Sequence, residues 1–334
     1  MSALVASPAK QDKVRELQRT LYRAAKADPG RRFHALYDKV HRRDVLERAW
    51  ANVRRKRGAA GIDQETIADV EEYGVSRLLD ELAAELREHR WRPLPARRVF
   101  IPKPGTSEQR PLSIPRVRDR IVQAATKIVI EPVFEADFLP CSFGFRPQRA
   151  QQDALQVLID EAWQGRRWVV ESDVASCFEA IPHDGLMQAV EERICDRHVL
   201  KLLRAMLRAG VMQDGAVRKP VTGTPQGGVI SPLLCNVYLH RLDREWQTDG
   251  AGELVRFADR CGRVVPEPPG GRARPCGARG HRGRTRAATE GGQDPDRASA
   301  RRWWGAGLPR LPPPLGARRV AAAPSRAVPG PLAF

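Results

Sequence analysis

Two aspartates stand at the ends of apolar, strand-like runs of residues. Asp173 follows Val-Val-Glu-Ser, and Asp259 follows Leu-Val-Arg-Phe-Ala. If the two strands are neighbours in one sheet, both carboxylates emerge at the same edge. Paired carboxylates can hold two Mg²⁺ ions about 4 Å apart, and such ions clamp the attacking and leaving oxygens of a phosphoryl transfer. Taken alone, however, the two aspartates are more simply interpreted as surface acids near turns.

The residues around the two aspartates predict an α+β fold that would position them. Helical spacing of apolar residues predicts helices within 75–86, 121–129, 154–162, 200–207 and 233–242. Short apolar runs predict strands at 168–173 and 254–259, each ending at one of the aspartates. Residues 211–221 have the pattern of a hairpin that turns at Asp214-Gly215.

The charge of the chain favours a polyanionic partner. Fifty-seven Lys and Arg residues against 40 Asp and Glu give a net charge of +17 and a pI near 10.4. Phosphate backbone is the commonest partner of such a surface, although simple solubility is the plainer alternative. We find no apolar run of the roughly 18 residues that a membrane span needs and no signal-peptide core, so we expect a cytoplasmic protein with no membrane partner. The six cysteines contain no C-x-x-C pair, which argues against a zinc knuckle and a disulfide scaffold.

The composition changes abruptly after Asp259. Residues 260–334 hold 15 Arg, no Lys and four acidic residues, together with 12 Pro and 12 Gly. No helical or strand periodicity continues there, so we expect this segment to be a disordered tail.

Several short motifs follow one another along the first 259 residues. They are 57–63 (RGAAGID), 101–104 (IPKP) with 110–115 (RPLSIP), 142–147 (SFGFRP), 172–178 (SDVASCF), 223–234 (GTPQGGVISPLL) and 256–259 (RFAD). In type and order they resemble the motifs of reverse transcriptases, most closely those encoded by bacterial group II introns. The matches run from about Leu36 to Asp259.

The resemblance implies a right-hand polymerase with fingers and a partial palm, in which helices pack on an antiparallel sheet. It divides the chain into an N-terminal helical extension (1–35), an N-terminal fingers and RNA-binding region (36–100), the fingers and palm (101–259) and the tail (260–334). The implied activity is RNA-templated DNA synthesis with Mg²⁺. Its implied partners are intron RNA, an RNA template, a DNA primer and deoxynucleoside triphosphates.

The resemblance also implies roles for individual residues. Those implied for the metal site and the catalytic step are Asp173 and Asp259, with the Val174 carbonyl as a companion metal ligand. Those implied for nucleotide binding are Lys103, Arg110, Phe178 and Gln226, and those implied for template and primer are Gly227 and Gly228. The plainer alternatives are a solvated hairpin around Lys103 and Arg110, a core position for Phe178 and a generic tight turn for the glycines. His183 has no Cys or His at ligand spacing, so we interpret it as structural.

An early basic stretch contains the candidate RNA-binding residues Arg54, Arg55, Lys56 and Arg57. In the family this part of the chain helps to hold template and intron RNA. The residue types alone indicate only attraction to phosphate, and a solvated basic helix face is nearly as good an interpretation.

The chain departs from the family at one decisive position. Family members continue the Phe-Ala-Asp motif with a second Asp that completes the metal site, whereas this chain has Arg260. The remaining palm, the thumb and the maturase region that the family places next are not recognisable in the tail. We therefore expect poor metal binding, little polymerase activity, a palm sheet that lacks a strand, and a tendency to aggregate.

The tail composition suggests a one-base insertion in a GC-rich gene. Read one base out of frame with synonymous codons chosen freely, residues 260–274 can encode DAVVLCRSRREAERA, which restores the missing acid. Residues 293–299 can encode KTRIVHL and residues 308–311 can encode FLGF, which resemble the next two palm motifs in order.

Other interpretations stay open. A polymerase-dead RNA chaperone would use the N-terminal basic surface to hold intron RNA. The Arg-rich tail could instead be a selected nucleic-acid-binding arm. Reverse transcriptases of retrons or diversity-generating elements fit less well, because their segment corresponding to TPQGG usually differs.

Overall fold

The structure is a computed structural model that describes residues 12–102, 105, 107, 109–166, 168–174, 177–218, 222–224, 227–249 and 253–265. The helices are α1 (Lys13–Ala27), α2 (Tyr37–Val40), α3 (Arg43–Arg55), α4 (Ile67–Tyr73), α5 (Val75–Arg87), α6 (Val117–Glu135), α7 (Gln151–Trp163), α8 (Cys177–Ala180), α9 (His183–Glu191), α10 (Arg197–Arg208) and α11 (Ser231–Asp249). The strands are β1 (Ala96–Pro102), β2 (Gln109–Ile114), β3 (Trp168–Asp173), β4 (Val211–Gln213), β5 (Ala216–Arg218), β6 (Glu253–Phe257) and β7 (Arg260–Val265). The α+β fold predicted from the sequence is confirmed.

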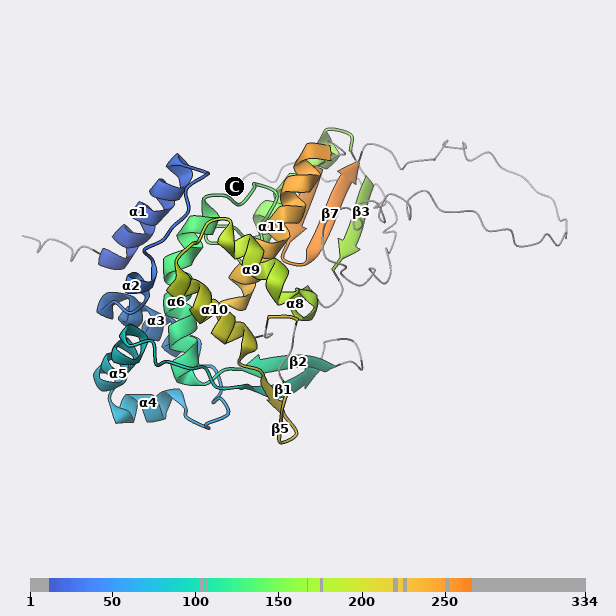
Figure 1. Ribbon diagram of the computed structural model, residues 1–334. Helices are drawn as coiled ribbons and strands as arrows, with labels where there is room; N and C mark the ends of the chain where they lie inside the picture. The colour runs from blue at the N-terminus through green and yellow to red at the C-terminus, as the bar shows by residue number, and fades with distance from the viewer. Residues whose placement is uncertain are drawn as a thin grey trace, which may run out of the picture.

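Helix α6 forms the centre of a helical layer at the N-terminal side of the molecule (Figure 1). Apolar residues surround its axis, and Ile121, Val129 and Ile130 are completely buried, as expected for a helix that is covered all round. The polar residues on α6 find partners: Thr126 donates to the Val122 carbonyl at 2.8 Å, and Gln123 accepts the Val229 N–H at 2.8 Å. Helices α1 and α3 pack directly against α6, and α5 packs against α3.

Two separate sheets flank this layer. The first has the strand order β2-β1-β4-β5, with β1 and β2 antiparallel and β4 joined to the start of β1 in parallel. The β4–β5 hairpin turns at Asp214 (φ 51°) and Gly215 (φ 77°), where the sequence predicted it. Two successive positive φ values belong to a hairpin turn whose twist matches that of its strands.

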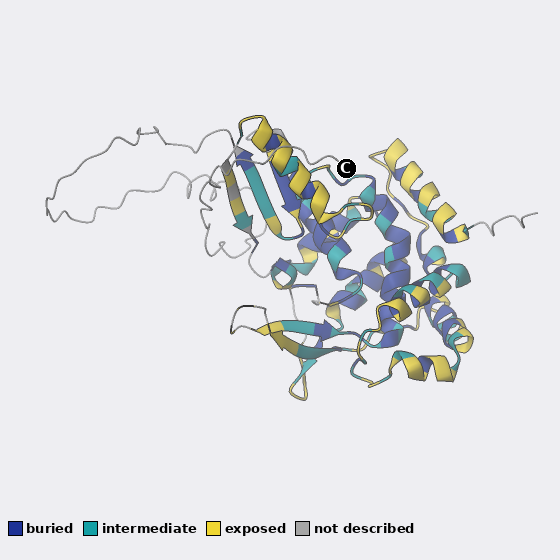
Figure 2. Ribbon diagram, turned by 180° about the vertical axis from the view of Figure 1, so that it is seen from behind, coloured by how far each residue is buried: buried dark blue, intermediate teal, exposed yellow. Residues whose placement is uncertain are grey.

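The second sheet has the order β3-β7-β6, and all its pairs are antiparallel. Burial increases from β3, where Val169 and Glu171 are exposed, to β6, where three successive residues are buried. Figure 2 shows the same gradient across the three strands. Within the described part of the chain, β3 has a neighbouring strand on one side only.

Strand β7 corrects the expectation that the chain becomes irregular at Arg260. Residues 260–265 pair with β3 and residues 260–264 pair with β6, so a strand stands where the sequence indicated the start of an irregular tail. Backbone hydrogen bonds do not require particular side chains, and Val264 is 1% exposed at the buried face of the strand. The rest of the predicted tail, residues 266–334, lies outside the described residues.

In the described part of the chain, no helix is both long and apolar enough to cross a bilayer. The predicted cytoplasmic location stays a prediction, and so do the domain boundaries near residues 35 and 100.

Candidate active site

The two aspartates singled out by the sequence meet at one end of the three-stranded sheet. Strand β3 ends at Asp173, whose backbone is in register with Arg260. Asp259 directly precedes Arg260 in the turn between β6 and β7, and its carbonyl accepts the Val174 N–H at 3.1 Å. The two strands are not direct neighbours, because β7 lies between them; the turn brings Asp259 round to β3. The side chain of Asp173 lies outside the described atoms.

The turn that carries Asp259 is tightly constrained. Ala258 has a φ of 60°, in the left-handed region that a non-glycine residue seldom adopts. The predicted SFGFRP motif packs directly against it: a Cβ built on Gly144 would lie 2.2 Å from the Ala258 nitrogen. Because that neighbour is backbone, only glycine fits at position 144.

Arg256 ties the turn to two other segments, α11 and the SFGFRP segment. Its side chain is 0% exposed, and all five of its N–H groups are hydrogen-bonded. The guanidinium forms a bidentate pair with Asp243, with both distances 2.7 Å. It also donates to Asn236 Oδ1 at 3.0 Å, to the Ala258 carbonyl at 2.8 Å and to Ser142 Oγ at 2.7 Å. A buried charge is tolerated when its donors are used in this way.

The same network orders the SFGFRP segment. The Phe143 N–H donates to the Arg256 carbonyl at 2.9 Å, and the Arg256 N–H donates to the Cys141 carbonyl at 2.8 Å. Asn236 donates to the Gly144 carbonyl at 2.8 Å. Burial alone would lower the pKa of Arg256, but the Asp243 carboxylate outweighs it and the pKa is raised, so the guanidinium stays charged.

This network was not predicted from the sequence. One signal was present: Asn236 and Asp243 are seven residues apart and therefore lie on one face of α11. A second was the arginine inside the apolar run Leu-Val-Arg-Phe. Neither signal identifies the partner, because Ser142 is 114 residues away from Arg256.

The two-metal centre stays a prediction, because the side chain of Asp173 is not among the described atoms. No group of three or more His, Cys, Asp or Glu residues among them is arranged to hold a metal ion. The Val174 carbonyl, a predicted ligand, accepts the Cys177 N–H at 3.2 Å. The nearby thiols offer no anionic sulfur, because a hydrogen bond with Cys235 and burial raise the pKa of Cys177, and burial raises that of Cys261 to about 12.

The segment before TPQGG lies against the helix that follows Asp173. The Thr224 N–H donates to the Phe178 carbonyl at 2.6 Å, and the Gly223 N–H donates to the Ile181 carbonyl at 2.7 Å. Phe178 is half-buried, and its ring meets that of Phe145 edge-on at 6.2 Å. His183 contacts the Gly223 carbonyl at 2.7 Å, which agrees with the structural interpretation of this histidine.

The end of the GTPQGG motif lies against the first sheet. Gly227 has a φ of 104°, and a Cβ there would lie 2.6 Å from the Ser113 carbonyl of β2. Arg110, on the same strand, is exposed and in register with Ile101, and Gly228 is buried. The loop thus brings the strand of Arg110 and the helix of Phe178 to one region. Lys103 and Gln226 lie outside the described residues.

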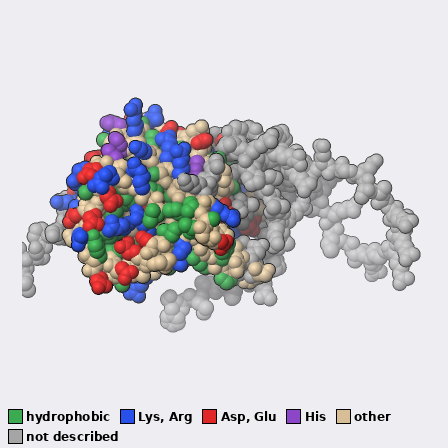
Figure 3. Space-filling view, turned by 60° about the horizontal axis from the view of Figure 1, so that its bottom comes forward, with side chains coloured by type: hydrophobic (Ala, Val, Ile, Leu, Met, Phe, Trp, Pro, Cys, Tyr) green, Lys and Arg blue, Asp and Glu red, His purple; other side chains and the backbone are tan. Residues whose placement is uncertain are grey.

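The four candidate RNA-binding residues lie on the surface at the end of α3. Arg54 is paired with Glu71 at 2.5 Å, and Arg55 contacts Asn52 at 3.4 Å. Lys56 and Arg57 are exposed. Figure 3 shows Lys and Arg side chains with acidic side chains among them on one face of the molecule, so basic residues alone do not mark a site on that face.

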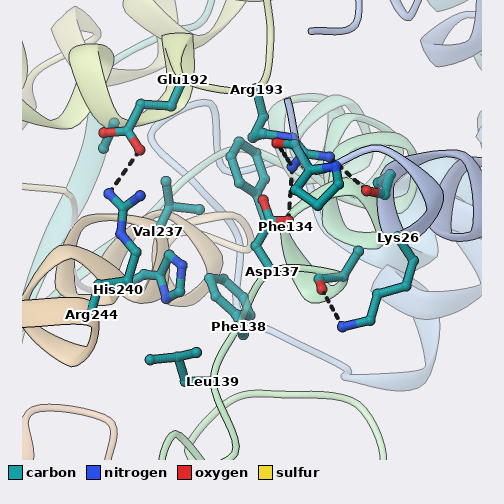
Figure 4. A pocket seen from close by; sticks show the side chains of 14 residues that line it. Lys26, Phe134, Asp137, Phe138, Leu139, Glu192, Arg193, Val237, His240 and Arg244 are labelled. Atoms are coloured by element: carbon teal, nitrogen blue, oxygen red, sulfur yellow. Dashed lines mark hydrogen bonds and ion pairs between the residues drawn. The ribbon is translucent and has the colours of Figure 1, made fainter. Parts of the chain in front are cut away.

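A cavity of about 470 Å³ lies away from the aspartates, where α1, α6, α9 and α11 meet (Figure 4). The charged side chains named next, which line this cavity, are paired with other groups of the protein. Arg193 donates to Asp137 at 2.9 Å, Arg244 donates to Glu192 at 2.9 Å, and Lys26 donates to a backbone carbonyl at 3.0 Å. None of the predicted site residues lines this cavity, and its contacts anchor the end of α1 to the rest of the fold.

Comparison with known proteins places the site in context. Residues 101–261 match the family described as "Reverse transcriptase (RNA-dependent DNA polymerase)". The Group II intron-encoded protein LtrA of Lactococcus lactis subsp. cremoris is 36% identical over 214 residues, which are 64% of this chain and 35% of that protein. Protein YkfC of Escherichia coli (strain K12) is 38% identical over 240 residues, which are 69% of this chain and 62% of that protein.

A third relative is the "Uncharacterized 91 kDa protein in cob intron" of Schizosaccharomyces pombe, 36% identical over 166 residues, which are 50% of this chain and 20% of that protein. The chain therefore spans less than two thirds of the length of each of these relatives. A solved complex, "Partial Cas6-RT-Cas1--Cas2 complex", overlaps 70% of this chain and 38% of its own at 24% identity with a TM-score of 0.46, which is too low to support a conclusion.

Proposed function

Residues 101–261 of this chain match the reverse transcriptase family, and from this premise we propose a reverse transcriptase and maturase of the group II intron lineage whose DNA synthesis is impaired. The inherited reaction is RNA-templated DNA synthesis. Its proposed partners are intron RNA, an RNA template, a DNA primer and deoxynucleoside triphosphates.

The position of Arg260 carries the proposal of impairment. This residue follows Asp259 directly and is in register with Asp173, so a fixed cation stands beside both carboxylate-bearing positions. Two unit charges 4 Å apart interact by about 4 kcal/mol at an effective dielectric near 20, and a divalent ion doubles this figure. Because Arg260 is exposed, solvent screens part of this repulsion, but its charge still disfavours Mg²⁺ at the place where the family has an acid.

The surroundings of the aspartates support the lineage. Gly223 and Gly227 hold one loop against both α8 and β2, so that Phe178 and Arg110 lie on elements that this loop joins. Glycine permits such close approach because it has no side chain. An aromatic ring and an arginine are suited to a sugar and a triphosphate respectively.

Primer extension on an RNA template tests the impairment. We expect the chain to give no full-length DNA with Mg²⁺ and deoxynucleoside triphosphates, and Arg260→Asp to bind Mg²⁺ more tightly in a calorimetric titration. Arg19→Asp, which makes the same change of charge at an exposed residue of α1, serves as the control for total charge. Robust Mg²⁺-dependent DNA synthesis by the unchanged chain would overturn the proposal.

A polymerase-dead RNA chaperone is the second candidate, favoured by the same arginine. It requires salt-sensitive binding to intron RNA without nucleotide incorporation, and binding that is insensitive to salt would exclude it. Sequencing the gene distinguishes both candidates from the interpretation of residues 260–334 as a selected, Arg-rich nucleic-acid-binding arm. The one-base insertion is wrong if deleting one base near the Asp259 codon opens no frame with the missing palm motifs.

A further inference from the structure

Four rings from three separate segments form a cluster at the surface. Tyr37 of α2 is its floor, and its hydroxyl donates to the Leu86 carbonyl at 2.7 Å. His89, just after α5, and His198, at the start of α10, are exposed and stacked, with ring centroids 4.1 Å apart and planes at 10°. His41 meets Tyr37 edge-on at 5.8 Å.

One buried carboxylate holds this cluster in place. Asp196 accepts the backbone N–H groups of Leu36 and Tyr37, both at 2.8 Å, and of His198 at 2.9 Å. Burial alone would raise the pKa of Asp196, but its backbone donors lower it, so the group stays ionised with its charge satisfied internally. The rings therefore stand on a fixed support rather than on a mobile loop.

Basic side chains surround the rings. Helix α10 contains no acidic residue, and its exposed Arg197 and Lys201 are one turn apart on the same face. Arg92 donates to the His89 carbonyl at 2.8 Å. The neighbouring Glu88 is paired with Arg90 at 2.5 Å and does not offset these charges. Figure 3 shows His side chains lying among Lys and Arg side chains.

We infer that this histidine surface (Tyr37, His41, His89, His198, Arg92, Arg197 and Lys201) binds a single-stranded segment of RNA. Bases stack on the exposed imidazoles, and the flanking cations contact phosphates. Stacking on flat side chains beside a basic track is the general way in which proteins hold single strands. The inference rests on the proposed RNA-binding function and adds a site separate from Arg54–Arg57 and from the aspartates.

Fluorescence anisotropy with a labelled RNA of about 16 nucleotides tests the site. The full chain is compared with His89→Ala/His198→Ala and with Arg197→Gln/Lys201→Gln. The matched control is Arg19→Gln/Arg23→Gln, two exposed arginines one turn apart on α1. Melting curves check that every variant is folded, since exposed substitutions change stability little.

We expect the histidine variant to bind the single strand about tenfold more weakly with an unchanged dependence on salt. The basic variant should lower the slope of log K against log salt by about 1.4, because two phosphate contacts are lost at about 0.7 each. The control should bind as the parent does. The histidine variant should leave binding to an RNA duplex of the same length unchanged.

Other results overturn the inference. If the parent binds RNA and both surface variants bind equally well, the site is wrong and the proposed function stands. If the histidine variant loses the same affinity for the single strand and for the duplex, the imidazoles do not stack on bases. If the parent binds no RNA even at about 50 mM salt, the site and the proposed RNA-binding function both fail.

Discussion

In the helical layer, apolar side chains from several helices share one core, whereas the sheet β3–β7–β6 depends on a small cluster and one charged network. Leu46, Leu82 and Ile121 are completely buried in the layer. The cluster beside the sheet consists of Phe143, Ala154 and Val255, with partly buried neighbours from α7. Among the described side chains of the sheet, the largest that is fully buried is that of Arg256.

The two regions also differ in the apolar side chains that they leave exposed. Along α7, the side chains of Leu155, Ile159 and Trp163 follow one another at helical spacing and are 48%, 48% and 83% exposed. Val169 on β3 is also exposed. The sheet that carries the two aspartates is thus held by a small apolar cluster and by polar contacts, and Val169 on its β3 edge is exposed. The sheet should therefore be more sensitive to the loss of a charge partner than to the loss of a methyl group.

Removing the partner of Arg256 should have the largest effect. Asp243→Ala leaves a buried guanidinium without its carboxylate and should lower the free energy of unfolding by about 3–5 kcal/mol. Urea unfolding followed by circular dichroism measures this change. The control Asp80→Ala removes an exposed partner of Arg43 and should cost under about 1 kcal/mol. Equal effects of the two substitutions would contradict the role of the network.

A cavity created in the helical layer should lower the free energy of unfolding less than Asp243→Ala does. It should lower it more than a cavity created beside the sheet. Leu82→Ala should lower the free energy of unfolding by about 3 kcal/mol, because a fully buried side chain is lost. Leu158→Ala, at a half-buried position near Val255, should cost about 1 kcal/mol. The same urea experiment measures both variants. A larger loss of stability for Leu158→Ala than for Leu82→Ala would contradict the difference between the two regions.

The boundary between the two regions should be sensitive to acid. Burial lowers the pKa of His240 on α11 to about 4, from 6.5 for a free histidine. The unfolded chain therefore takes up this proton first as pH falls, and stability present above pH 6.5 is lost towards pH 4. The loss is at most about 3 kcal/mol. His240→Gln should flatten the stability profile between these pH values, and an unchanged profile would refute the assignment.

The smallest effect on stability should come from the exposed stripe of α7. Trp163→Gln should change the free energy of unfolding by less than about 0.5 kcal/mol, because the ring is already exposed. It should reduce self-association in light scattering, since exposed apolar patches favour aggregation. Tyr22→Gln, at a solitary exposed ring on α1, is the control and should leave self-association as it is.

Much of the fold could be predicted, because the relevant signals are local. The hairpin at Asp214-Gly215 follows from two residues that accept positive φ, and the strand ending at Asp173 follows from an apolar run. Strand β7 could not be predicted, because Arg260–Val265 has little strand signal of its own. Its pairing is imposed by the strands on either side.

The candidate site was predictable only in part. The sequence indicated that Asp173 and Asp259 end strands, and the resemblance of the motifs indicated that they belong together. It did not indicate that Arg256 would hold their turn, because its contacts with Ser142 and Asp243 depend on how distant surfaces pack. The stacking of His89 on His198 likewise joins segments that share no sequence pattern.

Residue type, periodicity and covalent adjacency were enough to establish the kinds of element, the order of the motifs and the arginine that follows Asp259. These properties are carried by neighbouring residues along the chain, so they need no knowledge of the rest of the molecule. The buried Arg256 network, the place of β7 between its neighbours and the histidine surface arise only when segments far apart are packed together. Their energies come from desolvation and close contact, which exist only once the chain has folded.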